Sequence, residues 1–228
     1  MPEPWTTSAS ATLGGADGVV TLVEGSAFCL SSRSGEIDPD RPQGLIFRDT
    51  RFLSEFRLRL NGNALEPLTA TTPDPFSGVF VLRSPPAAGR ADAHLLVTRR
   101  RYVGRGMRED IEISNFGEEA AYCSVEIQLG ADFADLFEVK EGRVQKHGKH
   151  AVSDENGRVT FTYQRGAFRR ATLVDFSEIP RVAGEHVIYE VIVPSRGTWG
   201  TCIQVTPVLD RNEVTPRYVC GQPVGECG

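Results

Sequence analysis

The chain has 228 residues, of which 25 are Lys or Arg and 30 are Asp or Glu, so its formal net charge at pH 7 is −5. Hydrophobic residues make up 40% of the chain and charged residues 24%, and these globular values exclude a fully disordered protein. The acidic balance argues against general binding to nucleic acid or to an anionic membrane, because both need a surplus of Lys and Arg facing the phosphates.

Residues 1–17 are mostly small and polar, and we expect them to form a flexible segment. They lack the basic start and the apolar core of a secretory signal peptide. No stretch reaches the ~18 apolar residues that a membrane-spanning helix needs. The expected location is therefore the cytoplasm.

Apolar and polar residues alternate in several short segments, which is typical of strands with one buried and one solvated face. The clearest examples are 56–60, 121–129, 159–163 and 187–193. Turn signals separate the segments, among them Asn61-Gly62, Asn115-Phe116-Gly117 and the hairpin candidate Asn156-Gly157. No segment longer than about twelve residues shows a helical stripe, although a short helix is expected near 134–138.

Strands that follow one another without intervening helices predict an all-β fold. We expect an antiparallel β-sandwich of two layers, with long loops and at most short helices. This domain should span residues 18–209. The segment 31–44 is mostly polar and is expected to be a loop, whereas residues 210–228 lose the alternation and are expected to form a tail or linker.

Five cysteines lie at positions 29, 123, 202, 220 and 227. Because the number is odd and no Cys-x-x-Cys spacing occurs, the sequence supports neither a disulfide framework nor a zinc site. We expect reduced thiols, mostly packed in the interior, and leave open only a Cys220–Cys227 bridge. No metal or other cofactor is expected.

The segment ADFADLFEVK (131–140) holds the most informative carboxylates, Asp132, Asp135 and Glu138, and ends on Lys140. In a helical turn, residues three apart share a face, so two of these carboxylates could flank one substrate bond. Composition alone predicts roughly four acidic pairs at this spacing, so the spacing is not specific. The alternative, at least as well supported, is that Asp132 and Asp135 cap backbone N–H groups at a turn.

A second cluster is Arg48-Asp49-Thr50-Arg51. If this segment is a strand, Asp49 and Arg51 lie on one face and could form a bidentate ion pair. Such a pair would fix the register of the strand. The alternative is that Asp49 and Arg51 bind a sugar hydroxyl or another domain.

The basic segment TRRRYVGRGMR (98–108) is the third cluster. On a strand, Arg99 and Arg101 point to one face and Arg100 to the other, so these side chains do not form one coherent patch. We expect a solvated strand with cross-strand ion pairs, and the alternative is a contact with an anion or a sugar. Gly104-x-Gly106 lacks the third glycine of a dinucleotide-binding loop and predicts a turn.

Three blocks of the sequence, taken together, are specific enough to indicate a protein family. GLIFRDTRFLSEFRLRLNG (44–62), RYVGRGMREDIEISNFG (101–117) and LGADFADLFEVK (129–140) resemble, in this order, the N-terminal domain of bacterial glycogen debranching enzyme-like proteins, the amylo-α-1,6-glucosidase family. The resemblance covers about residues 18–209. It implies a supersandwich-like β-sandwich placed ahead of an (α/α) helical toroid, and in this family the toroid carries the glycosidase carboxylates.

The resemblance carries over no catalytic residue, because the chain ends soon after the expected last strand, WGTCIQVTPVL (199–209), and residues 210–228 do not resemble the start of a toroid. It implies a non-catalytic accessory domain whose partner is a glycosidase catalytic domain, in the same or a separate chain. α-Glucan contacts and self-association through an uncovered face are further expectations. The candidate contact residues are Asp49, Arg51, Asp132, Asp135, Glu138 and Lys140.

Two other functions stay open. The first is a stand-alone carbohydrate-binding module, although Trp5 and Trp199 are the only indoles available for stacking on sugars and Trp5 lies in the segment expected to be flexible. The second is a small glycosidase that uses Asp132 and Asp135 as its acid pair.

Overall fold

The structure is a computed structural model, and it describes residues 18–85, 94–144 and 147–224. The predicted flexible segment 1–17, and with it Trp5, lies outside these ranges. The described residues form strands and one short helix, so the prediction of an all-β fold is confirmed. Within the described ranges, no helix has the length and apolar character needed to cross a membrane.

The strands in chain order are β1 (Val19–Glu24), β2 (Ala27–Ser32), β3 (Gly44–Phe47), β4 (Thr50–Leu53), β5 (Glu55–Leu60), β6 (Asn63–Ala64), β7 (Glu66–Asp74), β8 (Ser77–Arg83), β9 (Leu95–Val103), β10 (Met107–Asn115), β11 (Ala121–Gly130), β12 (Lys149–Glu155), β13 (Arg158–Arg165), β14 (Phe168–Phe176), β15 (Arg181–Ala183), β16 (His186–Val193), β17 (Thr198–Leu209) and β18 (Asn212–Glu213). The helix is α1 (Leu136–Glu141). The expected short helix is therefore present, two residues later than predicted.

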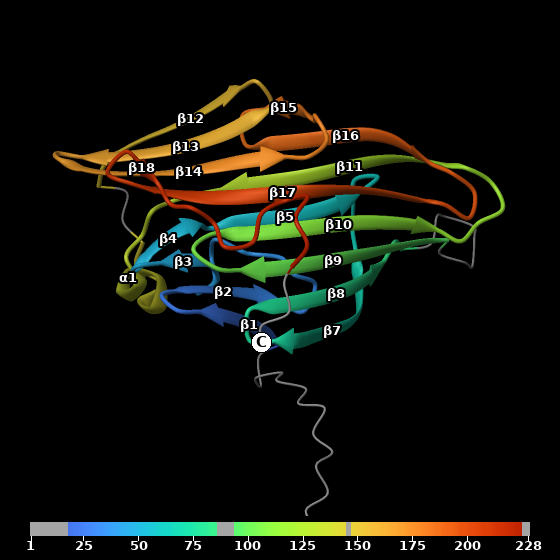
Figure 1. The fold of residues 1–228 in the computed structure, drawn as a ribbon, viewed down its shortest axis with the longest axis horizontal. Coiled ribbons are helices and arrows are strands. Elements are labelled where there is room, and N and C mark those ends of the chain that lie inside the picture. Colours follow the sequence, from blue (N-terminus) through green and yellow to red (C-terminus); the bar gives the residue numbers. More distant parts are fainter. Residues whose placement is uncertain (1–17, 86–93, 145–146, 225–228) are drawn as a thin grey trace, which may run out of the picture.

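The strands form three antiparallel sheets (Figure 1). The large sheet has nine strands in the order β12-β13-β14-β17-β10-β9-β8-β7, with β18 attached to β17. The small sheet has the order β15-β16-β11-β5-β6, and a four-stranded sheet has the order β1-β2-β3-β4. Contacts of β9 with β1 and β2, and of β17 and β10 with β16, place the two smaller sheets against the large one. This is the predicted sandwich.

One hydrophobic core lies between the layers. Alternate residues of β10 and β11 are buried because successive side chains on a strand point to opposite faces. Ile111 and Ile113 of the large sheet and Val125 and Ile127 of the small sheet are each at most 1% exposed and belong to the same core. The hairpin predicted at Asn156-Gly157 is also present, between β12 and β13, and both residues have the positive φ that such two-residue turns require.

The segment that follows β17 packs back on the large sheet. β18 pairs with β17, and the backbone N–H of Arg217 donates to the carbonyl of Gly104 at 2.9 Å. The ring of Tyr218 is 7% exposed and stacks on Phe76 with the centroids 5.1 Å apart. After position 209 the alternation is lost and β18 has only two residues, but the described residues beyond this point are still packed on the large sheet.

A disulfide joins Cys202 on β17 to Cys220 in this packed segment. The expectation of reduced thiols is wrong for these two residues, and the Cys220–Cys227 bridge that was left open is excluded; Cys227 itself lies outside the described residues. The error has a physical cause, since spacing along the chain gives no sign that the C-terminal segment returns to β17. Cys29 and Cys123 are free and buried, as predicted.

Candidate functional site

Arg51 is the centre of the first cluster that the sequence singled out. Its side chain is 1% exposed, and its Nε donates to Oδ1 of Asp132 at 3.0 Å while Nη2 donates to Oδ2. Nη1 donates to the carbonyl of Gln43 at 2.9 Å. Gly44 makes room for this guanidinium, because a Cβ at Gly44 would lie 2.5 Å from Cδ of Arg51. The arrangement is a satisfied, buried ion pair between β4 and the loop before α1.

Asp49 does not take part in this pair, so the predicted Asp49–Arg51 ion pair is wrong. Arg48 and Asp49 form the turn between β3 and β4, with φ values of 47° and 62°, and Asp49 is exposed. The turn breaks the strand alternation that would have placed Asp49 and Arg51 on one face. The backbone carbonyl of Asp49 instead accepts from the N–H of Leu136 at 2.9 Å, which ties the turn to α1.

The carboxylates of 131–140 cap backbone groups. Oδ1 of Asp135 accepts from the N–H of Phe137 at 2.8 Å, and Oε2 of Glu138 accepts from the N–H of Asp135 at 3.0 Å, which together form a capping box. Asp132 also accepts from the N–H of Ala134 at 3.3 Å. The capping alternative is therefore confirmed. Lys140 is exposed in the last turn of α1, where a cation complements the helix dipole.

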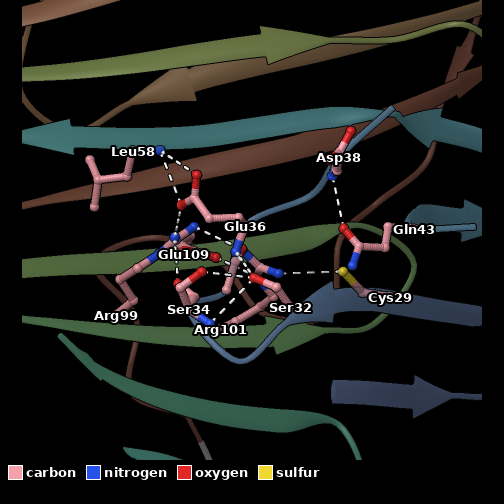
Figure 2. A network of polar contacts seen from close by, with 11 residues as sticks. Cys29, Ser32, Ser34, Glu36, Asp38, Gln43, Leu58, Arg99, Arg101 and Glu109 are labelled. Atoms are coloured by element: carbon pink, nitrogen blue, oxygen red, sulfur yellow. Dashed lines mark hydrogen bonds and ion pairs between the residues drawn. The ribbon is translucent and has the colours of Figure 1, made fainter. Parts of the chain in front are cut away.

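A second buried network lies in the core between the sheets (Figure 2). Arg99 and Arg101 on β9 and Glu109 on β10 are all fully buried. Glu109 accepts from Nε of Arg99 at 2.6 Å with one oxygen and from Nε of Arg101 with the other. The expectation of a solvated strand is wrong for these arginines, because their face of β9 points into the sandwich.

The loop between β2 and β3 completes this network. The carbonyl of Gly35 accepts from Arg99 at 3.1 Å and from Arg101 at 2.7 Å, and Glu36 accepts from Nη1 of Arg99 at 2.6 Å. Glu36 also accepts from the N–H of Leu58 at 3.1 Å. The polar segment that the sequence marks as a loop thus enters the core, where its polar groups match the two guanidinium groups.

The two carboxyl groups of the network have opposite pKa shifts. Burial disfavours the charged form of Glu109, but Arg101 and Arg99 and their hydrogen bonds outweigh burial, so the pKa of Glu109 is lowered. For Glu36, burial outweighs the contributions of Arg99 and of the Leu58 N–H, so the pKa of Glu36 is raised. Glu109 is therefore the principal counterion of the two arginines.

Two hollows adjoin β5 of the small sheet. One is about 300 Å³ and lies beside the loop before β3; it is lined by Ser34, Glu36, Ile37, Asp38, Arg57, Leu58, Arg59, Ala64, Leu65 and Leu82. The other is about 170 Å³ and is lined by Arg57, Arg59, Glu126, Ile127, Gln128, His186, Val187 and Ile188. Sequence reasoning did not select these residues, although the alternation in 56–60 places Arg57 and Arg59 on the solvated face.

The outer face of the small sheet carries exposed apolar side chains near the start of β11. Tyr122 on β11 and Ile192 on β16 are directly opposite each other in the register, and each is 66% exposed. Phe116, in the connection from β10 to β11, is 57% exposed. We call the neighbouring pair Tyr122 and Ile192 the apolar patch. Large exposed apolar side chains that lie together are typical of protein–protein contact sites.

Among the described residues, Asp110, Cys202 and Cys220 are a group of side chains that could bind a metal ion, since their ligand atoms lie within 4.8 Å of one another. The two sulfurs are bonded to each other, and Asp110 accepts from Arg108 at 2.9 and 2.8 Å. All three donors are therefore engaged within the protein.

The fold is similar to two solved structures of proteins named for sugar chemistry. A putative kojibiose phosphorylase from the human microbiome is 7% identical with a TM-score of 0.56, and the match covers 84% of this chain and 30% of that chain. A putative aldose 1-epimerase from Escherichia coli K12 is 7% identical with a TM-score of 0.50, covering 84% of this chain and 99% of that chain. At these identities the likeness concerns the fold alone. No curated protein matches the sequence.

The molecule is thus an antiparallel β-sandwich domain of the type found in these two proteins, and it contains buried arginine–carboxylate pairs. Residues 22–204 match the family described as the N-terminal domain of some glycogen debranching enzymes, and the chain belongs to this family. It spans about 30% of the length of the phosphorylase it resembles.

Proposed function

We propose that the chain is a non-catalytic accessory domain of a glycogen debranching-type glycosidase, and that it packs against a helical catalytic domain. The family match over residues 22–204 carries the proposal. The contacts of the acidic cluster support it, because Asp132 is bound by Arg51 and Asp135 caps α1. A glycosidase acid pair needs carboxyl groups that can reach a sugar and exchange protons with it, and carboxylates held in this way are poorly suited to that role.

The apolar patch is the surface that we assign to the catalytic domain. Tyr122 and Ile192 offer adjacent large side chains on a regular sheet, and aromatic residues with polar tips are enriched at protein interfaces. Tyr122 also donates from its hydroxyl to Glu190, so the ring is already oriented in the free domain. A pre-oriented ring loses little entropy on binding, which favours docking at this place.

An assay of glucose release from branched α-glucan limit dextrin tests the proposal. The purified chain alone is expected to release no glucose. Glucose release by the pure chain that is lost in Asp135→Asn would contradict the accessory role and favour the small-glycosidase alternative. The stand-alone carbohydrate-binding alternative requires saturable binding of maltooligosaccharides by the chain alone, and calorimetry tests for it.

A further inference from the structure

Strand β12 is an edge of the large sheet, and among the described residues no further strand pairs with its outer side (Figure 1). All seven of its residues, Lys149–Glu155, are exposed. The opposite edge, β7, contains Pro67 and Pro73 and two register shifts, and prolines and bulges prevent a sheet edge from pairing with another chain. β12 has no proline, and its register with β13 is regular along its whole length. One edge of the large sheet is therefore protected, and the other is open to a further strand.

The turn after β12 determines which backbone groups of the strand face outwards. Asn156-Gly157 is a two-residue turn, so the residues on either side of it, Glu155 and Arg158, form a hydrogen-bonded pair. Hydrogen-bonded and non-hydrogen-bonded pairs alternate along an antiparallel ladder. Three residues of β12 therefore direct their N–H and C=O groups away from β13, to the place of a further strand: His150, Val152 and Asp154.

The charges of β12 are complementary to those of a second β12 that runs in the opposite direction. Lys149 and His150 lie at one end of the strand, and Asp154 and Glu155 lie at the other. If a second copy pairs antiparallel about Val152, Lys149 lies opposite Glu155 and His150 lies opposite Asp154, and the two-fold axis repeats each pair. Opposite charges directly across two strands stabilise a sheet, and like charges destabilise it. In this register the outward-facing residues also pair with one another, so the backbone and the charges favour the same alignment.

Two of these side chains already have a defined position in the single chain. The ring of His150 packs on Tyr163, with the centroids 4.9 Å apart, and lies 6.3 Å from the ring of Phe133. Oδ2 of Asp154 accepts from the N–H of Gly184 at 3.4 Å. Side chains that are held before two molecules meet lose little entropy on association, which favours pairing at this edge.

We propose that the chain forms a two-fold symmetric homodimer in which β12 pairs antiparallel with β12 of a second copy, so that the two large sheets become continuous. Charged residues on an edge strand normally oppose pairing with other strands, and their order in β12 makes the second copy the matching partner. A strand of seven residues is smaller than the roughly 20–30 residues that each side of a standard interface contributes. We therefore expect a dissociation constant in the micromolar range.

Sedimentation velocity of the full chain over a concentration series tests this proposal, and a monomer–dimer equilibrium is expected. Lys149→Glu should weaken the dimer about tenfold, because a glutamate then faces Glu155 at two symmetric places. Glu155→Lys should weaken it by a similar factor, since two lysines then face each other. Glu119→Lys is the matched control: it changes the net charge as Glu155→Lys does, but lies exposed in the connection from β10 to β11, and it should dimerise as the wild type does.

Mixing the two weakened variants provides a sharper test than either alone. Lys149→Glu and Glu155→Lys should form a heterodimer of about wild-type affinity, because every glutamate then faces a lysine. Two misfolded proteins would not regain association in this way. The proposal is overturned if the wild type stays monomeric, if both single variants dimerise as the wild type does, or if mixing restores nothing. It is also overturned if Tyr122→Asp abolishes the dimer, since the apolar patch would then be the interface. No catalytic domain is present, so the result is independent of the proposed function.

Discussion

Arg51 and Asp132 lie 81 positions apart in the chain, yet their side chains form a buried bidentate ion pair. They come from two of the three sequence blocks that carry the family resemblance. The pair joins the β3–β4 hairpin to the segment that leads into α1. These two blocks therefore meet in the fold, although they lie far apart in the sequence.

Removing one partner of this pair should be costly. Asp132→Ala leaves the Arg51 guanidinium buried without its counterion, and we expect the free energy of unfolding to fall by about 3–5 kcal/mol in urea denaturation. Asp135→Ala removes only a helix cap and should cost about 1 kcal/mol, so it serves as the control. Equal losses in the two variants would show that the ion pair is not the important contact.

The core network makes a prediction about pH. The pKa of Glu109 is lowered in the folded state, so its charged form stabilises the protein above the unfolded value of about 4.3, and this contribution is lost as the pH falls through the folded value. Glu109→Gln should therefore destabilise the protein by about 3–5 kcal/mol at pH 7, and by less under acid conditions. The measurement is urea denaturation between pH 3 and pH 7 (roughly the range of carboxyl titration).

Glu36 provides the comparison, because burial raises its pKa. A raised folded pKa gives a contribution that is complete below the unfolded value and declines as the pH rises through the folded one. Glu36→Gln should therefore cost less than Glu109→Gln at pH 7, even though both side chains contact Arg99. A larger loss for Glu36→Gln would mean that the assignment of Glu109 as principal counterion is wrong.

The alternation of apolar and polar residues was sufficient to predict β5, β11, β13 and β16, because one face of each of these strands is buried. The alternation could not show that Arg99 and Arg101 of β9 face the core. The turn predicted at Gly104-x-Gly106 does, however, place Arg101 opposite Glu109, so this pair was within reach of sequence reasoning. Glu36 was not, because its loop shows no periodicity and its position depends on the arginines it meets.

Alternation in the sequence was equally insufficient to predict which side chains surround Arg59 of the small sheet. Arg59 was expected to be solvated from the pattern of β5, but its neighbours in the two hollows come from segments far apart in the sequence. Asp38 lies in the loop between β2 and β3, and His186 begins β16, which β11 separates from β5; only the folded chain brings them into the hollows that Arg57 and Arg59 line. The Cys202–Cys220 bond depends in the same way on a chain reversal that leaves no local pattern.

The disulfide should contribute measurably to stability. It closes a loop with a sequence separation of 18, and the chain-entropy relation gives about 3 kcal/mol for a loop of this size. Cys220→Ser should lower the free energy of unfolding by about this amount and loosen the segment after β17. Thermal unfolding with and without a thiol reductant checks this, and the reductant should have little effect on the variant. A wild-type protein that is insensitive to reductant would contradict it.

Tyr189 should limit stability at high pH. Burial raises the pKa of Tyr189 to about 12, so its neutral form stabilises the folded state up to the unfolded value near 10, and this contribution is lost as the pH rises towards 12. Denaturation between pH 9 and 12 (about the phenol range) should show a decline of up to about 3 kcal/mol that is smaller in Tyr189→Phe. Identical alkaline curves for the two proteins would refute the assignment.

Direct titration of the chain with the helical catalytic domain of a glycogen debranching enzyme from the same organism tests the central claim. Calorimetry should show saturable binding with a negative heat-capacity change, because apolar surface is buried. Tyr122→Asp should abolish this binding, and Arg59→Ala should leave it intact. The account is contradicted if an active catalytic domain gives no binding heat with the wild-type chain, or if Tyr122→Asp binds as tightly as the wild type.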